Sequence, residues 1–219
     1  MTRTLVAIPM KDPNAAKTRL MGVCAPAARE ALVLHLLGQT IRRLRAAQDL
    51  GARFEIAIVT TSRRIHAVAT ADGLPTISDL DIGLSGAAAS AKAWAEAQGF
   101  DALCILPGDI ASPHADDLAT LLARPNLDSV TLCPALDFGT NALVLPVKSE
   151  MAFAYGPGSF HTHQAKAVAA GLMPRILPLT SLRRDVDTQS DLTFLTADTR
   201  RVLRWTTPDA NDRHAHGPV

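Results

Sequence analysis

Short runs of apolar residues alternate with helical patterns along the chain. TLVAI at 4–8, FEIAIVTT at 54–61 and DALCILP at 101–107 are nearly continuous apolar runs, which are typical of strands buried on both faces. Between the first two runs, apolar residues recur at helical spacing and stop before Gly51, a residue type that commonly follows a helix. Strands that alternate with helices predict an α/β fold with one mainly parallel mixed sheet and helices on both faces.

The remaining pattern completes this series of elements. We expect a short helix after 54–61, a short strand over 75–78 and an alanine-rich helix over 85–98. The next helix begins with Ser112 as N-cap, followed by Pro113, and runs to Leu122. The remaining elements are strands over 129–135 and 141–146, a helix over 161–170, late strands over 175–179 and 183–187, and a last helix over 189–201. Residues 1–200 are then a single domain, and the polar segment 201–219 is expected to be a disordered tail.

Composition limits the partners of this domain. The chain has 219 residues, of which 47% are hydrophobic, and 22 basic residues nearly balance 21 acidic ones. A net charge of +1 provides no general field for a nucleic acid or a membrane surface, so we expect neither partner. The three cysteines lack metal-ligand or CxxC spacing, and no apolar run is long enough for a signal peptide or a transmembrane helix. We therefore expect a cytoplasmic protein; its oligomeric state stays open.

A basic segment follows the first predicted strand. PMKDPNAAKTRL places Lys11, Lys17 and Arg19 close to the strand end, where ligands of open α/β sheets bind. Three cations without a neighbouring glutamate suit a polyphosphate, although a solvated basic loop would have the same composition. The chain contains neither GxGxxG nor GxxxxGK[ST], which argues against a dinucleotide-binding dehydrogenase and a P-loop nucleotidase.

Aspartates follow two other predicted strands. LPGDI places Asp109 at the end of the central strand, and RRDVDT places Asp185 and Asp187 on one face of an extended segment. Like charges this close require a cation between them, and Mg²⁺ prefers oxygen ligands, so Asp109, Asp185 and Asp187 are candidate magnesium ligands. The alternatives are that Asp109 caps a helix, or that a surface turn lets Asp187 cap the helix that follows.

The segment YGPGSFHTH at 155–163 contains the third candidate feature. Its glycines and proline exclude a regular helix or central strand. If the amides of Gly156, Gly158 and Ser159 point inward before a helix that begins near His161, they form a concave surface suited to an anion. A plain turn between a strand and a helix is the alternative. His161 and His163 are two apart on that helix and cannot readily share a metal, so we expect them on its surface or behind the ligand-contacting groups.

Taken together, these motifs resemble a known family. IPMK…AKTRL, LPGDI, GTNALVLP, YGPGSF…H…A…G and DVDTQSDL occur in the order and at the spacing of the CofC/FbiD family, the phospholactate or phosphoenolpyruvate guanylyltransferases of coenzyme F420 biosynthesis. The resemblance covers about residues 3–195. It implies a single-domain nucleotidyltransferase (glycosyltransferase A-like) fold and a GTP-dependent transferase. Its substrates would be GTP and a small phosphorylated acid: phospholactate, phosphoenolpyruvate or phosphoglycerate.

The resemblance also implies roles for the residues. Mg²⁺ on the three aspartates would polarise the α-phosphate of GTP, and Lys17 and Arg19, with Lys11 nearby, would stabilise the leaving pyrophosphate. The groups implied to hold the acid are Thr140, Gly156 and Ser159, with Asn141 and Gly158 in the same motifs. For the guanine base, Pro9, Ser85 and Gly86 are positional candidates only.

The chain departs from the family pattern at two places. GDIAS stands where the family usually has ADLPL, and Phe138 stands where a glycine is common. Both lie near the predicted site, so they leave the identity of the acid open. Three other functions remain in view: another nucleotidyltransferase of the same fold, of molybdopterin or sugar-phosphate type; a noncatalytic GTP-binding regulatory domain; and a structural interaction protein.

Overall fold

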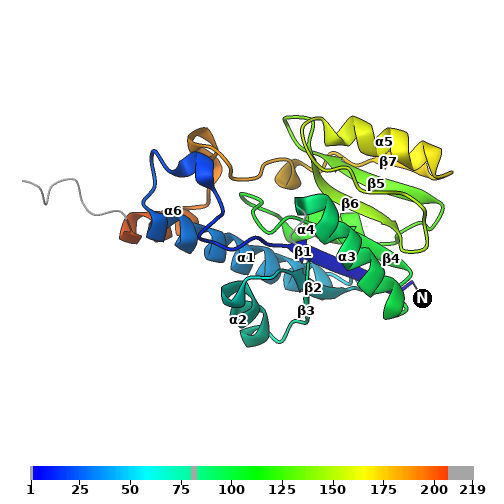
Figure 1. Cartoon of the computed structure of the whole chain (residues 1–219), viewed down its shortest axis with the longest axis horizontal. Coiled ribbons are helices and arrows are strands. Elements are labelled where there is room, and N and C mark those ends of the chain that lie inside the picture. Colours follow the sequence, from blue (N-terminus) through cyan, green and yellow to red (C-terminus); the bar gives the residue numbers. More distant parts are fainter. Residues whose placement is uncertain (1, 80–82, 207–219) are drawn as a thin grey trace, which may run out of the picture.

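A twisted seven-stranded sheet forms the centre of the protein, seen in a computed structural model that describes residues 2–79 and 83–206 (Figure 1). The strand order is β3-β2-β1-β4-β6-β5-β7, and β6 runs antiparallel to both of its neighbours. The other pairs are parallel, which confirms the mainly parallel mixed sheet. The strands are β1 (Thr4–Pro9), β2 (Glu55–Val59), β3 (Thr76–Ile77), β4 (Ala102–Ile105), β5 (Ser129–Pro134), β6 (Thr140–Pro146) and β7 (Met173–Ile176).

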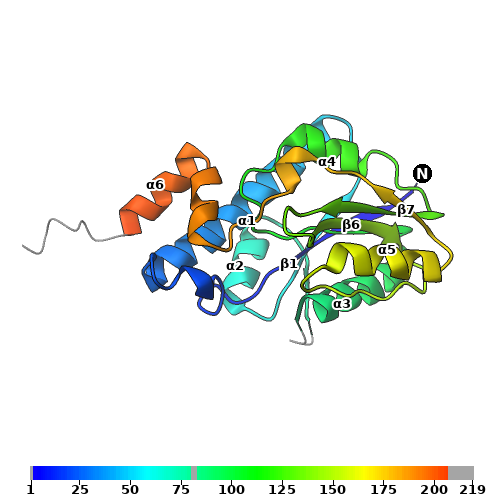
Figure 2. The same ribbon diagram turned by 90° about the horizontal axis from the view of Figure 1, so that it is seen from above.

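Helices cover both faces of this sheet (Figure 2). Because side chains alternate along a strand, Val6 and Ile8 of β1 pack in one apolar layer and Leu5 and Ala7 pack in the other. The first layer is closed by α1 (Pro26–Asp49), α2 (Arg63–Ala71) and α4 (Ala115–Leu122), and the second by α3 (Gly83–Ala97) and α5 (Ser159–Ala169).

A third apolar cluster lies beyond the sheet, around the first half of α1. Leu20 of the short 3-10 helix η1 (Thr18–Leu20) packs there with Leu32, Leu36 and the fully buried Val186. The later helices η2 (Thr180–Leu182), η3 (Gln189–Phe194) and α6 (Ala197–Thr206) complete the described part of the chain, and α6 packs along α1. This cluster fixes the segments that carry Lys17 and Asp185 to the same end of the sheet.

The last part of the chain differs from the prediction in two ways. Residues 183–187 are not a strand, because only Asp185 pairs, in an isolated antiparallel bridge with Ile110. The expected helix over 189–201 is two helices, since Leu195 takes an extended conformation (ψ 145°) and is buried in the third cluster. The hydroxyl of Thr196 then accepts a hydrogen bond from the backbone N–H of Thr199 at 3.2 Å and starts α6.

Other boundaries shift by about a turn or less. The helix predicted to begin at Ser112 and Pro113 starts at Ala115, because the N–H of Ala111 is held by the carbonyl of Arg184 and the chain stays extended. The N-cap is His114, whose N–H donates to Ser181 Oγ. Helix α5 starts at Ser159 rather than His161, and β7 covers 173–176 where 175–179 was expected.

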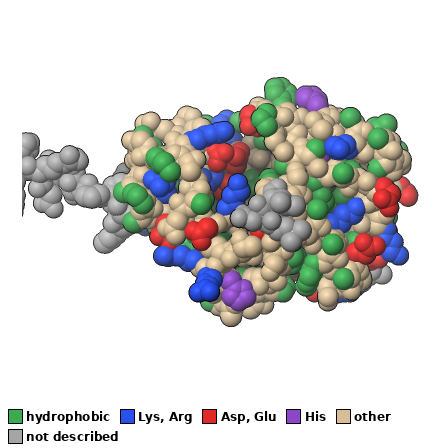
Figure 3. Space-filling model, viewed as in Figure 1, with side chains coloured by type: hydrophobic (Ala, Val, Ile, Leu, Met, Phe, Trp, Pro, Cys, Tyr) green, Lys and Arg blue, Asp and Glu red, His purple; other side chains and the backbone are tan. Residues whose placement is uncertain are grey.

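The expected tail is only partly described. Residues 201–206 belong to α6, and residues 207–219 lie outside the described residues, so the division into 1–200 and 201–219 stays a prediction. Over the described ranges, none of the helices combines the length and the apolar character needed to cross a membrane. Acidic and basic side chains are interspersed on the face shown in Figure 3, in keeping with the balanced composition.

Candidate functional site

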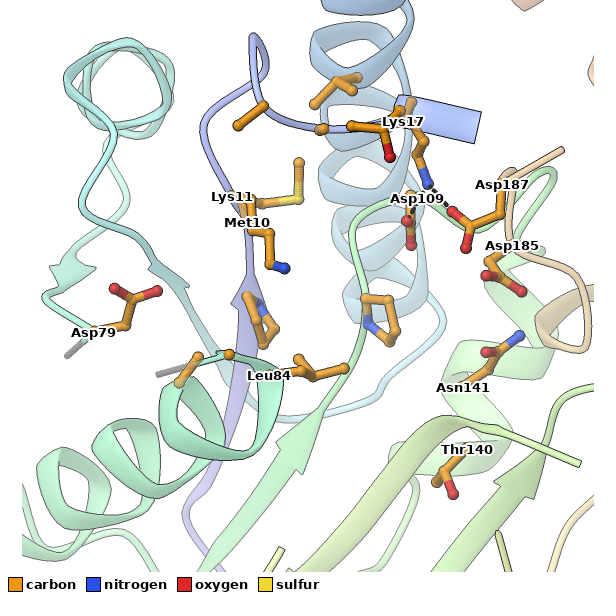
Figure 4. Close-up of a pocket in the computed structure, with 18 residues that line it drawn as sticks. Met10, Lys11, Lys17, Asp79, Leu84, Asp109, Thr140, Asn141, Asp185 and Asp187 are labelled. Atoms are coloured by element: carbon orange, nitrogen blue, oxygen red, sulfur yellow. Dashed lines mark hydrogen bonds and ion pairs between the residues drawn. The ribbon is translucent and has the colours of Figure 1, made fainter. Parts of the chain in front are cut away.

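A cavity of about 410 Å³ opens at the carboxyl ends of β1 and β4 (Figure 4). Because β6 is antiparallel to β4, its first residues, Thr140 and Asn141, reach this same edge of the sheet. The first turn of α3 closes another side. The polar residues that line the cavity are Lys11, Lys17, Thr18, Asp79, Asp109, Thr140, Asn141, Asp185 and Asp187.

Backbone pairing brings the three predicted aspartates together. The N–H of Ala111 donates to the carbonyl of Arg184 at 2.9 Å, and the N–H of Val186 donates to the carbonyl of Asp109 at 3.1 Å. Since Val186 is fully buried, its two neighbours, Asp185 and Asp187, face the cavity, as their spacing predicts.

The alternative that Asp187 caps the following helix is wrong. Thr188 is the N-cap of η3 and makes a reciprocal capping box with Asp191. The Oδ2 atom of Asp191 also accepts the N–H of Asp187 at 3.0 Å. The capping task is thus met by other residues, and the carboxylate of Asp187 is directed to the cavity.

Lys17 joins two of these carboxylates. Its ammonium group contacts Asp109 and lies 2.8 Å from Asp187 Oδ1, and its side chain is only 5% exposed. The backbone of Lys17 is left-handed (φ 55°), which directs the side chain back to the sheet edge. Burial alone would lower the pKa of Lys17, but the charges of Asp109 and Asp187 outweigh it and hold the pKa above its usual range.

Asp185 lies beside this ion pair without a cation of its own at contact distance among the described residues. Burial, followed by the charges of Asp109 and Asp187, raises the pKa of Asp185 to about 6. Among the residues that the structure describes, four carboxylates, including that of Asp79, and two ammonium groups, those of Lys11 and Lys17, line the cavity. A polyphosphate could bind there only with additional positive charge.

The donor types suit a hard divalent cation, because carboxylate oxygens are the ligands that Mg²⁺ prefers. Over residues 2–79 and 83–206, however, no three acidic, histidine or cysteine side chains are arranged so that they could hold a metal ion. It is the Lys17 ammonium that bridges Asp109 and Asp187. The magnesium site of Asp109, Asp185 and Asp187 therefore stays a prediction.

The predicted nucleotide contacts are only partly at the cavity. Pro9 and Lys11 line it, and Figure 4 shows the ammonium end of Lys11 directed into it. The side chain of Arg19 is 74% exposed, and its guanidinium lies 3.7 Å from Asp187 Oδ2, outside the lining. Ser85 and Gly86 are also outside the lining.

In place of Ser85 and Gly86, other residues of α3 line the cavity: Leu84 and Ala87. The hydroxyl oxygen of Ser85 instead accepts the N–H of Tyr155 at 2.8 Å, which ties α3 to the loop before α5. Sequence reasoning missed Asp79, although the strand-end rule would have found it two residues after β3.

The predicted anion loop is a tight turn before α5. Gly156 (φ 147°) and Gly158 (φ 68°) adopt conformations that other residues rarely take. The expectation of three free amides is wrong for Ser159, whose N–H donates to the carbonyl of Gly156 at 3.1 Å. None of residues 156–159 lines the cavity, but the hydroxyl of Ser159 donates to the hydroxyl of Thr140, which does, at 3.2 Å. The loop thus adjoins the cavity through Thr140.

Asn141 has a structural hydrogen bond at the same edge. Its side-chain amide is buried and donates to the carbonyl of Leu182 at 2.9 Å, which holds β6 beside the segment that leads to Asp185. One of the two amide hydrogens is therefore engaged, and the second N–H and the side-chain oxygen of Asn141 remain for a ligand.

One residue at each departure from the family pattern, Gly108 and Phe138, has a local structural explanation. A Cβ atom on Gly108 would overlap Met10 Sδ, so the glycine makes room for Met10 at the cavity wall. Phe138 has φ 66°, a conformation that glycine adopts without strain, and its exposed ring stacks on His161 with centroids 5.6 Å apart. The N–H of Phe160 donates to the carbonyl of Phe138, which joins this turn to α5.

Comparison with known proteins agrees with these features. The family model described as "Guanylyl transferase CofC like" matches residues 4–200. A 3-phospho-D-glycerate guanylyltransferase of Colwellia psychrerythraea is 34% identical over 88% of this chain and 91% of its own length. A phosphoenolpyruvate guanylyltransferase of Chloroflexus aggregans is 35% identical over 83% of this chain and 91% of its own length.

Solved structures share the fold. One from Desulfovibrio desulfuricans G20, described as a nucleotide-diphospho-sugar transferase, has a TM-score of 0.74 at 18% identity and covers 94% of this chain and 95% of its own. A CMP:2-keto-3-deoxy-manno-octonic acid synthetase has a TM-score of 0.59 at 13% identity and covers 94% and 100%. These likenesses confirm the predicted nucleotidyltransferase fold.

Proposed function

The chain belongs to the CofC-like guanylyltransferase family, and from that membership we propose that it transfers GMP from GTP to the phosphate of a small phosphorylated carboxylic acid. The candidate acids are 3-phosphoglycerate, phosphoenolpyruvate and 2-phospholactate, the acids that the names of its relatives give. The observation that carries the proposal is the meeting of Lys11, Lys17 and the aspartates in one cavity of a chain from this family.

In the proposed reaction, a phosphate oxygen of the acid attacks the α-phosphorus of GTP. A new phosphorus–oxygen bond forms, the bond to the oxygen that bridges the α- and β-phosphates breaks, and pyrophosphate leaves with that electron pair. The attacking phosphate is already largely ionised near pH 7, because its second pKa is about 6. No protein base is needed, so the protein contributes positioning and charge neutralisation.

The described side chains can divide this work. An ammonium group has three N–H donors, and Lys17 uses two of them on Asp109 and Asp187, which leaves one for a phosphate oxygen. Lys11 is exposed and directed into the cavity, so its side chain can adjust to the position of a bound triphosphate. Arg19 at the rim can contact the leaving pyrophosphate. Mg²⁺, held by Asp109, Asp185 and Asp187, would supply the charge that the acidic cavity lacks and polarise the α-phosphate.

A turnover assay tests the proposal. Purified protein is incubated with GTP, Mg²⁺ and each of the three acids in turn, pyrophosphate release is followed, and the product is weighed by mass spectrometry. We expect pyrophosphate and a guanosine diphosphate-linked acid in equal amounts with at least one acid, and neither product without an acid. Omitting Mg²⁺ in the presence of a chelator should abolish turnover, and Asp109→Asn is the inactive control.

The other functions predict different results. Tight GTP binding without pyrophosphate release for any acid would support a noncatalytic GTP-binding domain. Pyrophosphate release only with a sugar phosphate or a molybdopterin would support another nucleotidyltransferase. Turnover that is supported better by ATP, CTP or UTP than by GTP would contradict the guanylyl assignment.

A further inference from the structure

His163 on α5 is a fully buried polar residue that the proposed reaction does not yet use. Both of its ring nitrogens are engaged. Nδ1 lies 2.9 Å from Thr140 Oγ1, and Nε2 lies 3.0 Å from the backbone nitrogen of Ala154. The ring of Tyr155 packs edge-on against the imidazole, with centroids 4.8 Å apart. The histidine therefore connects the loop before α5 to the first residue of β6.

These contacts fix the protonation of the ring. A backbone amide can only donate, so Nε2 must be the unprotonated acceptor of the Ala154 N–H. Burial and then the charge of Lys166 lower the pKa of His163 to about 4, so the ring is neutral near pH 7. A neutral imidazole carries one hydrogen, which must be on Nδ1, and Nδ1 therefore donates to Thr140 Oγ1.

The direction of that bond decides what Thr140 can offer to a ligand. A hydroxyl oxygen accepts two hydrogen bonds and donates one. The Nδ1–H of His163 and the hydroxyl of Ser159 fill both acceptor positions of Thr140. The hydrogen of Thr140 is left to donate, and Thr140 lines the cavity. With the opposite tautomer, Thr140 would donate its hydrogen to Nδ1 and would present only its one remaining lone pair, which repels an anion.

We propose that His163 is a positioning residue that keeps the Thr140 hydroxyl a hydrogen-bond donor toward the anionic acid substrate. The inference rests on the proposed function for the identity of that anion. It assigns to the histidine of the YGPGSFHTH stretch a role that its neighbour His161 cannot share, because His161 is exposed on the opposite side of the helix.

Two variants separate this role from packing. In His163→Gln the amide can reach the position of Nε2 and accept the Ala154 N–H, but the donor to Thr140 is lost. In His163→Asn the amide nitrogen is bonded to Cγ, as Nδ1 is, so the donor to Thr140 is kept and the partner of Ala154 is lost. Stability should therefore fall more in His163→Asn, and acid binding should fall more in His163→Gln.

The expected result is a split between the two substrates. His163→Gln should weaken acid binding, measured by calorimetry and as the acid KM, roughly ten- to a hundredfold, with the GTP KM unchanged. His163→Asn should stay within about threefold of the original protein for the acid. In a Thr140→Val background, His163→Gln should cause no further loss, because the hydroxyl through which it acts is gone.

A failure of the His163 proposal can be distinguished from a failure of the proposed guanylyl transfer. Long-range proton–nitrogen NMR of the histidine ring reports the tautomer without any turnover, and an Nε2–H ring would overturn the proposal. Equal acid weakening in the two variants, or full additivity with Thr140→Val, would also overturn it. If the calorimetric split is found while no acid supports pyrophosphate release, the guanylyl-transfer proposal fails and the role of His163 stands.

Discussion

Replacing Lys17 by methionine tests the charge arrangement of the cavity most directly. The substitution removes the ammonium group while it keeps an unbranched side chain and the left-handed backbone at this position. Asp109 and Asp187 would lose the cation that both contact. Two consequences are expected, one for stability and one for turnover.

The stability effect can be bounded from the structure. Two unit charges 2.8 Å apart, the distance from Lys17 Nζ to Asp187 Oδ1, attract by about 6 kcal/mol at an effective dielectric constant of about 20. The side chain of Asp187 is 44% exposed, so water compensates much of this loss. Breaking a fully buried pair costs about 3–5 kcal/mol and a surface pair about 0–1 kcal/mol. We therefore expect the free energy of unfolding to fall by about 2 kcal/mol.

Turnover should fall by more than stability can explain. Removing one preorganised charge-stabilising group costs about 2–4 kcal/mol of transition-state stabilisation, or roughly thirty- to several-hundredfold in kcat/KM for GTP. Urea unfolding without ligands measures the first effect, and pyrophosphate release at a temperature where both proteins are folded measures the second. Lys17→Arg is the matched control that keeps the charge. Unfolding and kcat/KM values close to those of the original protein in Lys17→Met would refute this account of the cavity.

Three further predictions concern single side chains. Asp185→Asn and Asp187→Asn should both abolish turnover but should change stability in opposite directions. Urea unfolding should show Asp185→Asn stabilised by about 1–2 kcal/mol at pH 7, because burial and repulsion by neighbouring carboxylates raise the pKa of Asp185. Asp187→Asn should be destabilised, because its carboxylate charge beside the Lys17 ammonium group is lost. The pKa of His163 is lowered to about 4 in the folded protein, so the unfolded state binds a proton at this histidine first as the pH falls. The contribution of His163 to the free energy of unfolding should therefore be lost between about pH 6.5 and pH 4; a stability difference from His163→Gln that is constant over this range would contradict the prediction. Gly108→Ala should lower the free energy of unfolding by about 1–3 kcal/mol, because the added methyl group crowds Met10. In the double variant, Met10→Ala should cancel much of that crowding; purely additive losses in thermal unfolding would argue against the contact.

Much of this site could be located from the sequence, because several of its residues follow the ends of predicted strands. Lys11 and Asp109 lie just beyond the carboxyl ends of two strands, and the rule that ligands of open sheets bind there is independent of side-chain detail. Thr140 is the first residue of β6, and only the family resemblance assigned it to the site. The alternation of Asp185 and Asp187 also needs only an extended backbone, and a single bridge to Ile110 provides it. Such local rules hold although the predicted strand is not formed.

Contacts that join distant segments could not be predicted in the same way. Lys17 meets carboxylates from two remote segments, and its left-handed backbone has no signal in a segment without glycine. The lining by Leu84 and Ala87 instead of Ser85 and Gly86 depends on the rotation of α3, because successive helix residues point about 100° apart. An error of one residue in the predicted position of the helix is therefore enough to change which of its residues line the cavity.

The antiparallel strand β6 gives the cavity two different sides. Lys11 and Leu84 lie across it from Thr140 and Asn141 in Figure 4, with Asp109 and Asp185 at the upper right. Transfer of a phosphoryl group requires the attacking and leaving oxygens on opposite sides of the phosphorus. A triphosphate on the Lys11 side and an acid phosphate on the Thr140 side would meet this requirement beside the aspartates. A parallel strand in the place of β6 would direct its first residues to the other end of the sheet, so this arrangement depends on the reversal of one strand.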